Sequence, residues 1–218
     1  MGFALPNGAT VFVGSKMAAA LPATAVSNAK GAVFTVTGST LAVDDIVLIK
    51  SGWGLVDNLV AKVTIATATA ITIGSLDTSD TNFFPDGAGV GSLMKITDWM
   101  QIPQITEVGA SGGDQQYVQV QFLEDDRQRN LATFRAAKNQ TFTFAHDSSL
   151  AIYNVLLAGD RSGDTLPFYM YVPKAKEKRY WSGVASFDPQ PATAVNQVET
   201  VQVSIAVQSR TMTFYKDK

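Results

Sequence analysis

The chain contains no cysteine and only one histidine, and 17% of its 218 residues are charged. Without cysteine it has neither a disulfide nor a thiolate ligand for a metal, which fits a cytosolic protein. A basic excess is missing too, since 17 Lys and Arg stand against 19 Asp and Glu, a formal net charge of −2. Such a chain lacks the basic footprint with which proteins bind nucleic acid by releasing counterions.

Long apolar runs are also absent from the sequence. No uninterrupted apolar stretch approaches the ~18 residues of a membrane span, and the N-terminal sequence lacks the basic region of a signal peptide. We therefore expect neither membrane insertion nor export. The chain is nevertheless 46% hydrophobic, which is enough to fold around a core as one large β domain or two small ones.

Alternation at period two dominates what is present. It is clearest in residues 198–208 and recurs in 115–122 and 141–144, and it predicts strands with one buried and one polar face. The polar positions are nearly free of charge, whereas a solvated sheet face would normally carry Lys and Glu. This composition favours a sheet that faces a neighbouring subunit or an enclosed channel. The residues we predict to face a channel are Gln119, Gln121, Gln202, Ser204 and Gln208.

The fold class predicted by these patterns is mainly β, an antiparallel β-sandwich or barrel with one flanking helix and a small N-terminal β lobe. Residues 1–30 lack sustained periodicity and indicate an arm or extended segment. Residues 31–93 carry several short strand patterns and are expected to form the lobe, and residues 94–218 the sandwich. A helix is expected over residues 147–159, capped by Asp147 or Ser148 and ended by Gly159, with a short helical turn around residues 130–138.

No set of residues predicts catalysis, a cofactor or a metal site. His146 and Asp147 are adjacent, and adjacent strand residues point to opposite faces, so they do not form a base with its orienting carboxylate. The glycines of residues 87–91 do not open a helix and indicate a flexible turn. The basic turn of residues 174–179 is typical of a soluble hairpin tip. We expect a structural protein, not an enzyme.

A mixed cluster of charges follows the predicted strand at residues 115–123. It lacks the spaced oxygen ligands of a calcium loop, and it predicts either a solvated loop or a strip of ion pairs between subunits. The cluster consists of Glu124, Asp125, Asp126, Arg127 and Arg129.

Several stretches together resemble the major tail tube proteins of long-tailed, siphovirus-like bacteriophages. They are Ile96–Val108, Ser111–Gln116, Gln121–Asp126, Phe144–Asp147 and Val195–Val203, in an order that places the expected helix after the fourth. The resemblance covers roughly residues 94–215, and residues 1–93 look like the variable lobe that such proteins carry beside the tube-forming sandwich.

The resemblance implies a structural protein of the virion tail. In that family the subunits form hexameric rings, the inner sheets join around a channel, and the rings stack through loops and terminal arms. The implied partners are further copies of the chain, a tape-measure protein, a tail terminator and tail tip proteins. DNA would pass through the tube without specific binding, and no cofactor or membrane is involved.

Two other readings stay open on the sequence alone. Another ring-forming tail protein, such as a terminator or connector, would form one ring and stop. A carbohydrate-binding β-sandwich would need an exposed aromatic platform, for which Trp53, Trp99 and Trp181 are the candidates.

Overall fold

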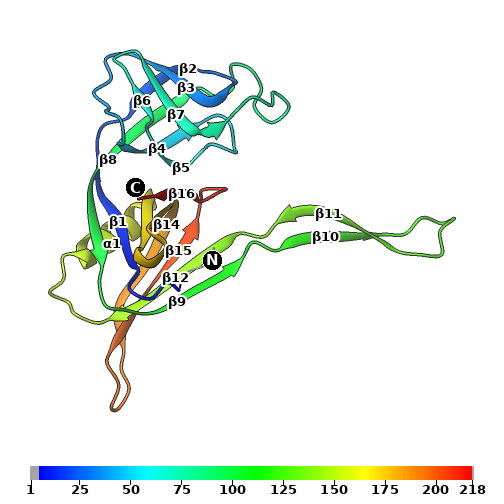
Figure 1. Cartoon of the computed structure of the whole chain (residues 1–218). Coiled ribbons are helices and arrows are strands. Elements are labelled where there is room, and N and C mark those ends of the chain that lie inside the picture. The colour runs from blue at the N-terminus through cyan, green and yellow to red at the C-terminus, as the bar shows by residue number, and fades with distance from the viewer. Residues whose placement is uncertain (1–4, 218) are drawn as a thin grey trace.

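The computed structural model describes residues 5–217 and is almost entirely antiparallel β-structure with one helix (Figure 1). The main sheet runs in the order β6-β7-β3-β2-β8-β1-β13-β14-β15-β12-β9, with β16 paired to β14 and with β4 and β5 attached through β8. Its end strands, β6 and β9, do not pair with each other, so the sheet is not closed into a barrel. The predicted class, a mainly β sandwich with one flanking helix, is confirmed.

One part of the sheet forms the body of the sandwich. Its strands are β1 (Thr10–Met17), β8 (Gly91–Ile102), β9 (Ile105–Gly112), β12 (Lys138–Ala145), β13 (Thr165–Val172), β14 (Glu177–Ala192), β15 (Thr200–Val207) and β16 (Thr213–Lys216), with the 3-10 turn η1 (Pro173–Ala175) before β14. Large aromatic and branched side chains fill its core, where Phe142, Phe144 and Trp181 are almost fully buried. Their alternation with polar residues fixes which face of each strand is buried.

The small lobe is inserted between β1 and β8, which pair with each other directly. It contains β2 (Leu21–Val26), β3 (Lys30–Val36), β4 (Ile46–Ser51), β5 (Leu59–Lys62), β6 (Ile65–Ala66) and β7 (Ala70–Asp77) around a hydrophobic core of its own. The long strand β8 belongs to both parts, because its first half pairs with β2 and β4 and its second half with β1.

Residues 10–17 therefore do not belong to an arm. The sequence analysis assigned residues 1–30 to an arm or extended segment, but β1 lies inside the sandwich sheet between β8 and β13, and Val11 and Val13 are buried in its core. Within residues 10–17 only Val11, Val13 and Gly14 are buried, and this is too brief a pattern to reveal a strand. Residues 1–4 lie outside the described residues.

Aromatic packing joins the lobe to the sandwich. Tyr180 of β14 and Ile96 of β8 pack against Leu48 and Val60 of the lobe, with Trp99, Tyr169 and Tyr215 around them. The hydroxyl of Thr213 donates to the carbonyl of Val60 at 2.7 Å, and the Tyr215 hydroxyl accepts from the backbone N–H of Lys62 at 2.9 Å. Because apolar packing and hydrogen bonds both cross the junction, the two parts support each other.

The helix α1 (Ile152–Ser162) covers the core face of the sandwich, and it begins and ends later than predicted. Neither Asp147 nor Ser148 caps it, since its N-cap is Ala151 and no side chain makes a cap hydrogen bond. Asp147 lies before the helix. Its carboxylate instead accepts from the backbone N–H and hydroxyl of Ser149, closing a turn before the helix. Gly159 lies inside the helix, where an added Cβ would come within 2.6 Å of Leu166, and the helix ends at Gly163 with φ of 66°. Close packing, rather than a stop, explains the glycine at 159.

Residues 113–137 form a hairpin that leaves the body of the molecule. Strands β10 (Gln115–Val120) and β11 (Arg129–Arg135) pair only with each other, in a sheet of their own. Figure 1 shows this hairpin projecting far from both cores. The short helical turn expected around residues 130–138 is wrong, because β11 occupies most of that stretch. We call residues 113–137 the arm.

Candidate assembly surfaces

Strands β9, β12, β15 and β14 present an uncovered polar face on the side opposite the core. The pairing registers align their outward residues in three rows across the sheet, since directly paired residues lie on the same face. The rows are Glu107, Thr143, Gln202 and Asp188; Gly109, Thr141, Ser204 and Ser186; and Ser111, Asn139, Ala206 and Val184. We call these residues the polar face.

Small and uncharged side chains make up most of the polar face, and its only charges are two carboxylates. Glu107 and Asp188 stand at opposite ends of one row, and none of the described residues in the three rows is Lys or Arg. The sequence analysis placed no carboxylate among the residues expected to face a channel. The acidic character of the face depends on the pairing of β9 and β14 with this sheet, because these strands carry Glu107 and Asp188. The face repels polyanions and offers them no cation.

The face assignment predicted for residues 198–208 is the one the structure has. Val201, Val203 and Ile205 of β15 are buried in the sandwich core, whereas Gln202 is exposed on the other side and Ser204 is partly exposed. Gln208 lies just beyond β15, and its backbone N–H donates to the carbonyl of Ser182 at 2.9 Å. Gln208 therefore follows the end of β15 and is not a member of the three rows.

Gln119 and Gln121 do not share this face. Gln119 lies on β10 and Gln121 just after it, both exposed on the arm, and the side chain of Gln121 donates to the carbonyl of Asp125. The sequence pattern of residues 115–122 also predicted a buried apolar face, and this is wrong, because Val118 is 48% exposed. Local alternation identifies a strand but does not say whether a core covers it.

The predicted charge cluster forms the tip of the arm. Arg129 pairs with Asp125 inside the tip at 2.6 Å. Glu124, Asp126 and Arg127 make no ion pair with any of the described residues. Two members of the cluster, Asp125 and Arg129, are thus paired with each other, and the other three remain exposed at the tip without an ion pair.

Apolar side chains are exposed along both faces of the arm. Val118 and Leu131 are paired on one face, while Tyr117 pairs with Ala132 on the other. A two-stranded hairpin is marginally stable alone, and exposed apolar patches of this kind mark interaction sites. The exposed large apolar side chains of the arm are Tyr117, Val118, Phe122, Leu123, Leu131 and Phe134. Apolar side chains of the arm are thus exposed to solvent on both of its faces in the single chain.

The polar face is bounded by two edges. β9 is the last strand of the sheet, and β14 beyond Val184 pairs on one side only, with β15. The N–H of Phe187 on that second edge donates to the carboxylate of Asp160 at 3.2 Å, and Pro189 offers no N–H. The edge of β14 is therefore partly protected against unspecific pairing, whereas β9 is open.

Histidine and tryptophan side chains often form catalytic or ligand-binding sites in proteins, but in this chain they contribute to packing. The Nδ1 of His146 lies 2.8 Å from the hydroxyl of Tyr153, beside the helix, and no group of three potential metal ligands occurs within residues 5–217. Trp53 and Trp181 are buried, and Trp99 packs against Tyr169. The tryptophans form no exposed platform for a glycan.

A comparison with known families decides the identity. The sequence profile of the family described as phage tail tube protein, TTP, matches residues 51–217. The chain belongs to the phage tail tube protein family. This family is structural, so the tail tube protein is a component of the virion tail and not an enzyme. The resemblance seen in the sequence is confirmed, and the match reaches into the lobe, upstream of the residues that carried it.

Other comparisons add little. Among solved structures, a chain in the cryo-EM structure of the anti-feeding prophage (AFP) baseplate matches with 12% identity and a TM-score of 0.39, over 56% of this chain and 86% of that one. No curated protein sequence matches the tail tube protein. In the described part of the chain, no helix is long and apolar enough to cross a membrane.

Proposed function

We propose that the tail tube protein assembles into hexameric rings that stack into a hollow tube, and that the polar face lines the channel through which DNA is delivered. The observation that carries the proposal is the set of three paired rows, which combine an uncovered sheet face with two carboxylates and no cation. A face of this kind does not fit open solvent, where Lys and Glu would be mixed. It fits an enclosed wall.

The charge of the polar face suits the passage of DNA. Proteins hold DNA mainly through Lys and Arg that replace condensed counterions on the phosphates. A wall that carries Glu107 and Asp188 without a cation leaves those counterions in place. Binding of DNA to this wall is therefore not favoured by counterion release. DNA in transit would be kept away from the wall by repulsion.

The edges and projections support repeated contacts between copies. The four strands of the polar face end in β9 on one side and in the second half of β14 on the other, so that neighbouring copies can meet edge to edge around a ring. Two hairpins project from this sheet (Figure 1): the arm, and the turn between β14 and β15, where Val195 is 89% exposed. Projections with exposed apolar side chains suit contacts between stacked rings. A tape-measure protein, a tail terminator and tail tip proteins are the further partners we propose.

Thiol labelling tests the position of the polar face. Because the chain has no cysteine, Ser204→Cys places a single thiol on the polar face and Thr40→Cys places one on the surface of the lobe. In unassembled protein both thiols should react with a bulky maleimide polymer. In tubes, the thiol at 204 should resist the polymer but still react with a small maleimide, while the thiol at 40 reacts with both.

Two outcomes would contradict this proposal. Equal labelling of both positions by the polymer in intact tubes would place the polar face on the outside. Rings that never stack, at any protein concentration, would favour a tail terminator or connector, with the polar face around a single opening.

A further inference from the structure

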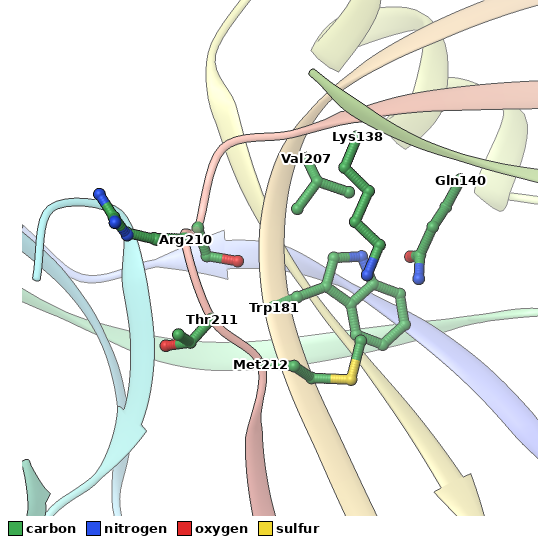
Figure 2. Close-up of a pocket in the computed structure, with 8 residues that line it drawn as sticks. Lys138, Gln140, Trp181, Val207, Arg210, Thr211 and Met212 are labelled. Atoms are coloured by element: carbon green, nitrogen blue, oxygen red, sulfur yellow. The ribbon is translucent and has the colours of Figure 1, made fainter. Parts of the chain in front are cut away.

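A small pocket opens at the junction of β12, β14 and the segment that follows β15. Its volume is about 30 Å³, and its lining includes Lys138, Gln140, Trp181, Arg210 and Met212 (Figure 2). The indole of Trp181 forms its floor, and Lys138 reaches over it in the figure. The pocket lies outside the polar face.

Two buried polar atoms in this pocket lack a hydrogen-bond partner among residues 5–217. The Nε1 of Trp181 and the Oε1 of Gln140 are both buried and unpaired, and Trp181 is only 1% exposed. A buried donor without an acceptor costs about 1–3 kcal/mol, so such atoms are normally satisfied by something in the working molecule. No described residue accepts from the Trp181 N–H, so a group from outside the chain can fill that place.

Positive charge surrounds the same pocket. Lys138 and Arg210 stand at its rim, and neither forms an ion pair with the described residues. In Figure 2 the guanidinium of Arg210 is directed away from the indole, so its side chain must turn to reach a ligand there. A buried N–H donor beside one or two unpaired cations is a site for a carboxylate, which accepts several charge-assisted hydrogen bonds at once.

The arm tip carries the complementary group. It presents the carboxylates of Glu124 and Asp126, without ion pairs to described residues, next to Phe122 and the fully exposed Leu123. We propose that the pocket binds the acidic tip of the arm of a second copy, with a carboxylate between Lys138 and the Trp181 N–H and with Leu123 against the apolar rim. This inference rests on the proposed assembly into rings and tubes.

The geometry of the chain fits such an exchange. Lys138 is paired with Gly112 at the base of the arm, so each copy holds its pocket beside the root of its own arm. The seven residues of β11 alone span roughly 23 Å at about 3.3 Å per residue. The tip therefore cannot fold back into its own pocket and must meet another copy. A tip and a pocket at different places on the molecule make a head-to-tail contact, which propagates into rings or tubes.

Reversing the charges separates this contact from general effects of charge. The pocket variant Lys138→Glu/Arg210→Glu and the tip variant Glu124→Lys/Asp126→Lys should each fail to assemble at concentrations where wild-type protein forms tubes. We expect the critical concentration to rise at least about tenfold, which corresponds to roughly 1.4 kcal/mol per contact. An equimolar mixture of the two variants should assemble again, because each tip then finds an oppositely charged pocket on the other variant.

Controls distinguish failure of this inference from failure of the proposed function. Lys30→Glu/Lys174→Glu makes the same change of net charge away from the pocket and should assemble like wild type. A disulfide between copies carrying Leu123→Cys and copies carrying Thr211→Cys should form in tubes and not in unassembled protein. If wild-type protein forms tubes while both charge variants do so equally well, the pocket holds only a water molecule and the inference is wrong. If wild-type protein forms neither rings nor tubes, the proposed function itself fails.

Discussion

The two faces of β15 should respond in opposite ways to the same substitution. Val203 is fully buried, paired with Phe142 on one side and Phe187 on the other, whereas the neighbouring Ser204 lies in the middle row of the polar face. Aspartate at position 203 would place a carboxylate in the sandwich core, while aspartate at 204 would leave it in water. We expect Val203→Asp to unfold the subunit and Ser204→Asp to leave the fold intact.

The burial of each position sets the size of the effect. Loss of a fully buried valine costs about 1.5–3 kcal/mol from burial alone. An unpaired charge in the same place raises the total beyond the 4–5 kcal/mol that marks exceptional substitutions. The free energy of unfolding of a typical domain is about 5–15 kcal/mol, so most of the stability would be lost. Ser204→Asp should stay within roughly 0.5 kcal/mol of wild type, as surface substitutions do.

Urea unfolding followed by tryptophan fluorescence measures both effects, because Trp181 lies in the same core. Val203→Ala is the matched control, since it opens a cavity without adding a charge and should fall between wild type and Val203→Asp. Equal stability of the two aspartate variants, at any level, would refute the assignment of the faces and with it the polar face.

Three further predictions concern other parts of the molecule. Gly112 has φ of 76°, and an added Cβ would lie 1.9 Å from the carbonyl of Ala137, so Gly112→Ala should raise proteolytic cleavage of the arm while the two cores still unfold cooperatively. Burial raises the pKa of Tyr180 above its usual value near 10. The stability that this tyrosine contributes is therefore complete below about pH 10 and is lost as the pH rises further. In urea titrations at alkaline pH, the free energy of unfolding of Tyr180→Phe should fall less with pH than that of wild-type protein. Asp160→Ala removes the acceptor of the Phe187 N–H and should cost about 1 kcal/mol in thermal unfolding, whereas Asp160→Asn, which keeps an oxygen there, should cost less.

The sequence predicted the elements whose patterns are local and long. The alternation in residues 198–208 predicted the right strand and the right buried face, and the helix expected over residues 147–159 overlaps α1. Its start was misplaced because Asp147 engages Ser149 in a turn, and a turn and a cap use the same residue types.

Long-range pairing could not be predicted. That Glu107 and Asp188 share a row with Gln202 depends on two registers between strands far apart in the sequence. The arm was missed for a related reason, since Val118 belongs to an alternating pattern that here has no core to cover it. β1 was missed because only a few of its residues are buried, and the lobe inserted after it separates it from its partner β8. Local periodicity predicts which residues of a strand share a face. What covers each face depends on how the strands pair in the folded sheet.

Electron microscopy of the purified tail tube protein over a concentration series, with and without short tube fragments as seeds, tests the central claim most directly. The account predicts hollow tubes of stacked six-fold rings, with a channel wide enough for duplex DNA and with the polar face on its inner wall. Protein that stays monomeric at every concentration even when seeded, or that forms solid fibres without a channel, would contradict it.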